Sequence, residues 1–138
     1  MEPLKTSRES LPRREEKPSK SLPERILACL QEVHSSLGPG LLETVYEEAV
    51  AHEFMLQGLR FIRQKEAKLI YKGKEIGWHR VDFLVEDEVV VELKAVERIH
   101  GIHGAQLVAS LRSLGKKAGL LVNLNAVPLS GGIKKVHL

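Results

Sequence analysis

Hydrophobic residues recur at two different spacings along the chain, and the change of spacing separates helices from strands. Apolar side chains three or four residues apart predict helices over about 23–37, from about 41 to near Gly58, and over 102–114. Alternating and β-branched segments predict strands over 61–71, 75–85, 89–96, 118–124 and 133–138. The resulting order, ααβββαββ, is typical of an α/β domain of the α+β type, with a mixed β-sheet flanked by α-helices.

Turn-forming residues mark the boundaries between these elements. Ser21 is a candidate N-cap for the first helix, and Pro23 lies in its first turn. Gly38-Pro39-Gly40 separates the first two helices. Lys72-Gly73-Lys74 and Glu86-Asp87-Glu88 are the expected turns of two successive hairpins, so the first three strands form a meander.

Composition divides the chain into a tail and one domain. Residues 1–22 contain three prolines, six basic and four acidic residues and few apolar ones, which predicts a disordered N-terminal tail. Residues 23–138 have the length of a single domain. The net charge of the whole chain, +3, permits a nucleic-acid partner without requiring one.

Cysteine content and hydropathy predict the compartment. The only cysteine, Cys29, has no partner for an internal disulfide. No apolar run approaches the roughly 18 to 20 residues that span a bilayer, and the N-terminus lacks the apolar segment of a signal peptide. We therefore expect a cytoplasmic protein with no membrane partner.

A polar patch is expected where the second and third strands meet. Side chains alternate between the faces of a strand, so Asp82 should lie on the face opposite to Val81 and Phe83. On the very apolar strand that follows, Glu92 and Lys94 share the face opposite to the core. The turn at 86–88 then places Asp82 opposite or diagonal to Glu92, and two carboxylates meet one ammonium group.

Such a patch suits a magnesium ion, or manganese in its place, because Mg²⁺ prefers oxygen ligands and uses one or two carboxylates with water and substrate phosphate. Lys94 could orient or help to deprotonate an attacking water. Metal-assisted phosphodiester hydrolysis needs a Lewis acid, an activated water and a cation near the developing charge. The same spacing also occurs in ordinary solvated Glu–Lys pairs on strands.

Two helical pairs are further candidates. Glu43 and Tyr46 are three residues apart on one helical face, and Glu43 could add a third carboxylate to the ion. A Glu in the first turn is also favoured by the helix dipole. Tyr46 could equally be a half-buried residue that packs against the rest of the domain. His103 and Gln106 share a face of a later helix. Gln106 could hold a water or a phosphate oxygen, and His103 could act as a general acid or cap the helix.

These residues together resemble the GxxExxY family, a branch of the PD-(D/E)xK nuclease-like superfamily. The naming motif matches Gly40, Glu43 and Tyr46, and the resemblance covers about residues 22–138. It extends to the segments 80–82, 91–97, 103–107 and 119–123. The family's usual acidic, aromatic and Phe residues are replaced here by Gly104, Ser110 and Leu124.

The resemblance implies a restriction-endonuclease-like core and a role for each motif residue. Asp82 and Glu92, with the Leu93 carbonyl, would be metal ligands, and Lys94 the water-activating cation. Glu43 would be the helix acid and a further ligand, and Gln106 a supporting residue. We assign contacts with the nucleic acid to Arg80, His103 and Tyr46.

The sequence therefore predicts a Mg²⁺-dependent nuclease that acts on DNA. Two alternatives remain open at this point. One is a noncatalytic nucleic-acid-binding module that keeps the fold. The other is a protein-interaction subunit, because an apolar final strand over 133–138 leaves a sheet edge that could pair with another chain. A homodimer is compatible with each of these functions.

Overall fold

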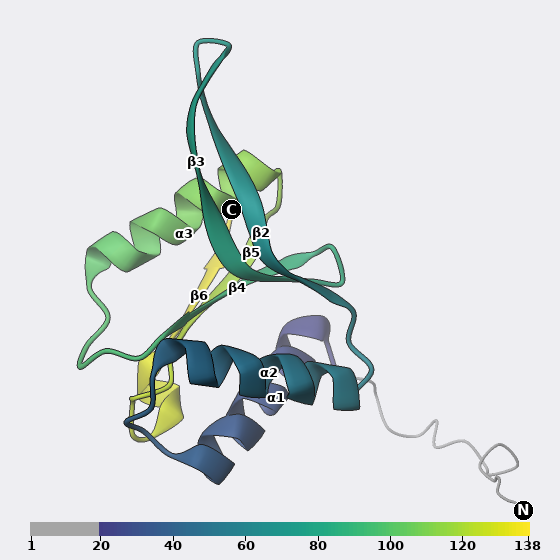
Figure 1. The fold of residues 1–138 in the computed structure, drawn as a ribbon, viewed down its shortest axis with the longest axis vertical. Helices are drawn as coiled ribbons and strands as arrows, with labels where there is room; N and C mark the ends of the chain where they lie inside the picture. Colours follow the sequence, from purple (N-terminus) through teal and green to yellow (C-terminus); the bar gives the residue numbers. More distant parts are fainter. Residues whose placement is uncertain (1–19) are drawn as a thin grey trace, which may run out of the picture.

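The computed structural model describes residues 20–138, in which three α-helices surround a five-stranded sheet (Figure 1). The helices are α1 (Leu22–Leu37), α2 (Glu43–Leu56) and α3 (Gly101–Leu114). The strands are β2 (Phe61–Tyr71), β3 (Lys74–Val85), β4 (Val89–Lys94), β5 (Ala118–Asn123) and β6 (Ile133–His137), with a short 3-10 helix, η1 (Leu129–Gly132), before β6. The predicted fold class is confirmed, whereas residues 1–19 of the predicted tail lie outside the described residues.

The start of α1 follows the sequence prediction. Ser21 Oγ accepts a hydrogen bond from the Glu24 N–H, and the Glu24 carboxylate accepts one from the Ser21 N–H. This capping box satisfies two backbone donors at the end of the helix. No helix within residues 20–138 is both long enough and apolar enough to cross a membrane.

The sheet has its strands in chain order, β2-β3-β4-β5-β6. All neighbouring strands are antiparallel except β4 and β5, which are parallel and are connected through α3. The apolar β4, predicted as the middle of the sheet, is its central strand, and β6 is an edge. The carboxyl end of β4 therefore lies between the β2–β3 hairpin and the segment after β5.

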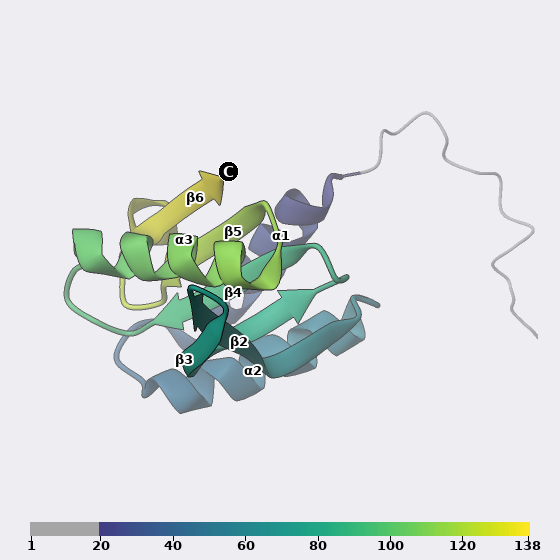
Figure 2. The ribbon, with the colours of Figure 1, turned by 90° about the horizontal axis from the view of Figure 1, so that it is seen from above.

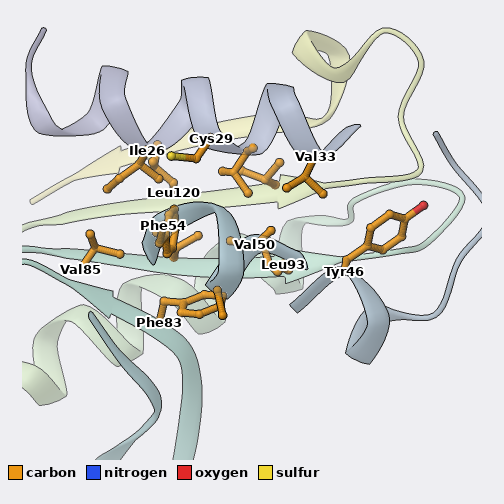
Figure 3. Close-up of a cluster of buried hydrophobic side chains, with 14 of the residues drawn as sticks. Ile26, Cys29, Val33, Tyr46, Val50, Phe54, Phe83, Val85, Leu93 and Leu120 are labelled. Carbon is orange, nitrogen blue, oxygen red and sulfur yellow. The ribbon is translucent and has the colours of Figure 1, made fainter. Parts of the chain in front are cut away.

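The two faces of the sheet have separate hydrophobic layers. Helices α1 and α2 pack on one face, where Ile26, Tyr46 and Phe54 meet Phe83 and Leu93 (Figure 3). Helix α3 packs on the other face, on the side of the sheet opposite to α2 (Figure 2). Because helices cover both faces of the sheet, a charged side chain in β4 is tolerated only where it reaches solvent through a gap between a helix and the sheet.

Val81 departs from the predicted alternation. It packs with Leu84 in the layer beneath α3, whereas strict alternation would place it with Phe83. The β2–β3 ladder lacks the pair between Gln64 and Asp82, and Gln64 has a φ of 53°. Since alternation holds only along a regular ladder, this distortion lets Val81 and Leu84 both reach α3.

The β2–β3 hairpin extends well beyond the rest of the sheet (Figure 1). Its strands have 11 and 12 residues, but only three residues of β3, Phe83 to Val85, pair with β4. The turn residues Lys72 and Gly73 have φ values of 49° and 83°, the left-handed conformation that two-residue hairpin turns require. We call residues 65–80 the arm.

Candidate functional site

Asp82 and Glu92 lie side by side where β3 and β4 separate. The ladder ends at the Phe83–Val91 pair, so the next positions on the two strands are Asp82 and Glu92. Their carboxyl groups are within hydrogen-bonding reach of each other, and the Leu93 N–H donates to Asp82 Oδ2 at 2.7 Å. The predicted juxtaposition of these two carboxylates is confirmed.

Both carboxyl groups are harder to ionise than usual. Burial, followed by the charge and hydrogen bonding of Asp82, raises the pKa of Glu92 to about 8, although the Lys94 ammonium opposes this shift. Burial also raises the pKa of Asp82, while the hydrogen bond from Leu93 lowers it. Two partly buried like charges repel, so near neutral pH the pair retains a proton unless a cation compensates the second charge.

A pocket beneath α3 gathers most of the residues predicted for the site. It is lined by Arg80, Glu92, Lys94, His103 and Gln106, together with His79, Leu107, Ser110 and Leu121. Thus one wall comes from the hairpin, the floor from β4 and β5, and the other wall from α3. Lys94 and Gln106 face the same space as Glu92, as the alternation on β4 and the helical spacing predicted.

The structure also explains how α3 presents its polar residues. The His100 N–H donates to His103 Nδ1 at 3.0 Å, so the imidazole caps the helix, one of the predicted roles of His103. His79 Nε2 lies 2.5 Å from Ser110 Oγ, and that hydroxyl also donates to the Gln106 carbonyl at 3.0 Å. His79 was missed in the sequence analysis because nothing in the spacing of the chain connects it with Ser110.

Glu43 is placed differently from the prediction. Its Oε2 accepts a hydrogen bond from the Ala95 N–H at 3.2 Å, just beyond the end of β4. Within residues 20–138, no group of three or more His, Cys, Asp or Glu side chains is placed to hold one metal ion. The expected third carboxylate therefore does not join Asp82 and Glu92, since Glu43 is held by the backbone that follows β4.

The α2 carboxylate nearer to Asp82 is Glu47, which sequence analysis did not single out. Gln64 Nε2 donates to Glu47 Oε1 at 2.9 Å and to Asp82 Oδ1 at 3.2 Å, so one amide bridges the two acids. Glu47 also pairs with Arg63 at 2.9 Å, and its negative charge contributes to the raised pKa of Asp82. Glu47 lies one helical turn after Glu43, so helical spacing makes both glutamates candidates, and the packing of α2 on the sheet decides between them.

Tyr46, predicted to contact substrate, is completely buried. Its hydroxyl donates to the Gly38 carbonyl at 2.6 Å and accepts from the Leu41 N–H at 3.2 Å. The ring therefore packs under the sheet and the hydroxyl fastens the α1–α2 loop. This corrects the assignment of Tyr46 to the substrate.

The residues of the Gly40, Glu43 and Tyr46 motif all form hydrogen bonds that hold the α1–α2 loop and the start of α2 in place. The Gly40 N–H donates to Asn125 Oδ1 at 2.8 Å, while Glu43 bonds Ala95 after β4. Gly40 has a φ of 103°, a conformation that favours glycine. Gly40 and Glu43 attach the beginning of α2 and the loop before it to the segments that follow β5 and β4, whereas Tyr46 holds the α1–α2 loop itself.

We expect Tyr46→Phe to lower the free energy of unfolding by about 1–2 kcal/mol. The ring would still fill the core, but the Gly38 carbonyl and Leu41 N–H would lose their partner. Thermal and urea unfolding would measure the loss. The exposed Tyr71, changed to Phe, is the matched control and should unfold like the wild type; equal stability of the two variants would contradict the fastening role.

The donor set at the end of β4 fits a hard divalent cation. Asp82 and Glu92 supply carboxylate oxygens whose mutual repulsion a cation would relieve. The carbonyl of Leu93 points to the same side of the strand as its N–H, which reaches Asp82, because the two groups of one strand residue point the same way. It adds a neutral oxygen donor on the side where β3 has separated.

Comparison with known families decides the relationship. A model of the PD-(D/E)XK nuclease superfamily matches residues 20–136. The chain belongs to this superfamily. The superfamily name describes Pro-Asp followed later in the chain by Asp or Glu, any residue and Lys, and the chain contains Val81-Asp82 and Glu92-Leu93-Lys94.

Membership in the superfamily indicates a nuclease-like function, and PD-(D/E)XK nucleases typically use divalent metals. Searches among curated proteins and among solved structures gave no match. The superfamily also agrees with the mixed sheet and its flanking helices.

Proposed function

We propose that the protein is a Mg²⁺- or Mn²⁺-dependent nuclease of the GxxExxY type, which hydrolyses phosphodiester bonds of DNA. The observation that carries this proposal is the adjacency of the Asp82 and Glu92 carboxyl groups, with Lys94 in the same pocket. Their raised pKa values reflect a site that favours added positive charge.

Each residue of the site has a role that follows from its chemistry: Glu92, Lys94 and Gln106 line the pocket, and Asp82 adjoins it through Glu92. Asp82, Glu92 and the Leu93 carbonyl would hold the cation. When bound, a divalent cation supplies Lewis-acid stabilisation of charge on phosphate oxygens and makes water a better nucleophile. The Lys94 ammonium would orient the attacking water and stabilise negative charge on the phosphate, and the Gln106 amide would position a phosphate oxygen.

The proposal is tested by calorimetric titration of Mg²⁺ and Mn²⁺ into the wild type and into Asp82→Asn. Plasmid and oligonucleotide cleavage is measured on the same samples. We expect the substitution to weaken metal binding about 10- to 100-fold, because it removes a charged ligand. A matched control is Asp87→Asn, an exposed Asp in the β3–β4 turn whose carboxylate pairs with Lys116 and not with Glu92.

Metal-dependent cutting by the wild type that falls with metal affinity in Asp82→Asn would support the proposal. Absence of both metal binding and cleavage over a broad range of metals would overturn it. That result would favour the noncatalytic nucleic-acid-binding or protein-interaction module. Glu92 and Lys94 would then be an ordinary charged pair at the end of a strand.

A further inference from the structure

The arm exposes large apolar side chains that the fold does not use. The exposed fractions are 60% for Ile70, 59% for Tyr71, 61% for Ile76 and 51% for Trp78. These residues lie on the part of the hairpin that projects beyond the sheet (Figure 1). Such a concentration of exposed apolar area on a projecting element indicates a surface that contacts a partner.

The arm is also basic. Between residues 65 and 80 the sequence has five Lys and Arg but two Glu, so the arm alone carries a net charge equal to that of the whole chain. Within residues 20–138, none of these five cations forms an ion pair with a carboxylate. Arg80 lies over the Trp78 ring at 5.0 Å from its centroid, and Lys72 over the Tyr71 ring at 5.4 Å.

The two faces of the arm are different. One face turns toward α3, where Ala67 is buried opposite His79, and His79 contacts Ser110. The other face is exposed and carries Trp78 opposite Lys68. Alternation places Arg80 on this same face of β3, so an apolar ring and cationic side chains follow one another along it, while the exposed Ile76 lies at a bulge nearer the tip.

We propose that this exposed face of the arm docks in a groove of duplex DNA and holds the duplex beside the Asp82–Glu92 site. This inference rests on the proposed function and names the surface that binds its substrate. Arg80 connects the two regions, because it belongs to the arm and also lines the pocket that contains Glu92 and Lys94. The arm therefore leads directly to the residues that would contact the scissile phosphate.

The shape and charge of the arm favour duplex DNA over a second copy of the chain. A two-stranded ribbon fits the major groove of B-form DNA, which is about 12 Å wide. Lysines can neutralise phosphates on either side of the groove, and Ile or Trp can make apolar contacts with base edges such as the thymine methyl group. Two arms brought together would instead place five cations against five, with only two acidic residues on each arm.

Fluorescence anisotropy with a labelled 30-base-pair duplex tests this inference in EDTA, so that no cleavage takes place. We expect Trp78→Ala to weaken binding at least tenfold and Trp78→Phe to retain most of the affinity, since a phenyl ring still makes apolar contacts with base edges. Lys68→Gln with Lys72→Gln should reduce the slope of log K against log salt by about 1.8. The matched control changes Lys117 and Lys135, which are exposed on the far side of the sheet, to Gln.

Binding losses confined to the arm variants, with unchanged thermal melting, would support the inference. Duplex affinity within twofold of the wild type in Trp78→Ala and in the double lysine variant would overturn it. So would stronger binding of the matching single strand, or light scattering that shows the arm variants to alter self-association instead. If the arm variants bind and cleave DNA normally, the role of the arm in DNA binding is refuted but the nuclease proposal is not. If binding depends on the arm but the wild type does not cleave, the nuclease proposal is refuted but the role of the arm is not.

Discussion

Lys94→Ala should lower the rate of DNA cleavage about 100- to 1,000-fold at saturating metal. The ammonium group shares the pocket with Glu92 and Gln106, where the attacking water and the phosphate would meet. Removing it takes away positive charge that is needed most in the transition state. The effect should therefore fall on kcat, which single-turnover assays at saturating Mg²⁺ would measure.

A metal titration separates a direct effect of Lys94 on the cleavage rate from an indirect effect through weaker metal binding by Asp82 and Glu92. Lys94 opposes the upward shift of the Glu92 pKa, so Lys94→Ala should raise that pKa further and weaken metal binding modestly. Saturating metal restores occupancy but should not restore the rate. Lys117→Ala, an exposed lysine near the start of β5, is the charge-matched control. Equal cleavage by the wild type and Lys94→Ala would disprove the proposed role of Lys94.

The central part of the site could be predicted because it depends on local rules. A short turn joins β3 to β4, so the number of residues on each side fixes the register and places Asp82 opposite Glu92. Alternation on β4 then brings Glu92 and Lys94 to one face. The helical spacing of His103 and Gln106 likewise placed both in the pocket.

The remaining parts depend on packing between elements that are distant in sequence. The direction of α2 across the sheet decides that Glu43 reaches the Ala95 N–H and that Glu47 reaches the Gln64 bridge to Asp82. Nothing local to helix 43–56 distinguishes these two glutamates. The buried position of Tyr46 also follows from where the α1–α2 loop meets its hydroxyl.

Irregular backbone explains why Val81 lies on the other face of the sheet from the one that alternation predicts. Alternation assumes a continuous ladder, but the ladder is interrupted where Gln64 adopts a φ of 53° beside Asp82. The position of Val81 beneath α3 follows from this interruption. The same distortion brings the Gln64 amide to the Asp82 carboxylate. Val81, the residue for which alternation predicted the wrong face, is the neighbour of Asp82 in the chain.

The metal-free protein should become less stable as the pH rises from about 5.5 to 7.5. The Glu92 pKa is raised from 4.5 to about 8 in the folded chain, so between these values the folded state holds a proton that the unfolded chain has released. Unfolding then releases a proton, and higher pH favours unfolding. The expected loss is up to about 1.4 kcal/mol per pH unit for one proton, measured by urea unfolding in EDTA.

Glu92→Gln isolates this contribution, because its amide stays neutral at every pH. The variant should show a flatter pH profile and be more stable than the wild type at pH 7.5 in EDTA, whereas Glu88→Gln, an exposed control in the turn before β4, should follow the wild type. Adding Mg²⁺ should stabilise the wild type more at pH 7.5 than at pH 5.5, since cation binding must displace the shared proton. Glu92→Gln should lose most of that stabilisation. A wild-type profile that is flat in EDTA, or a Mg²⁺ effect equal at both pH values, would show that Asp82 and Glu92 are not a proton-sharing pair that binds the cation.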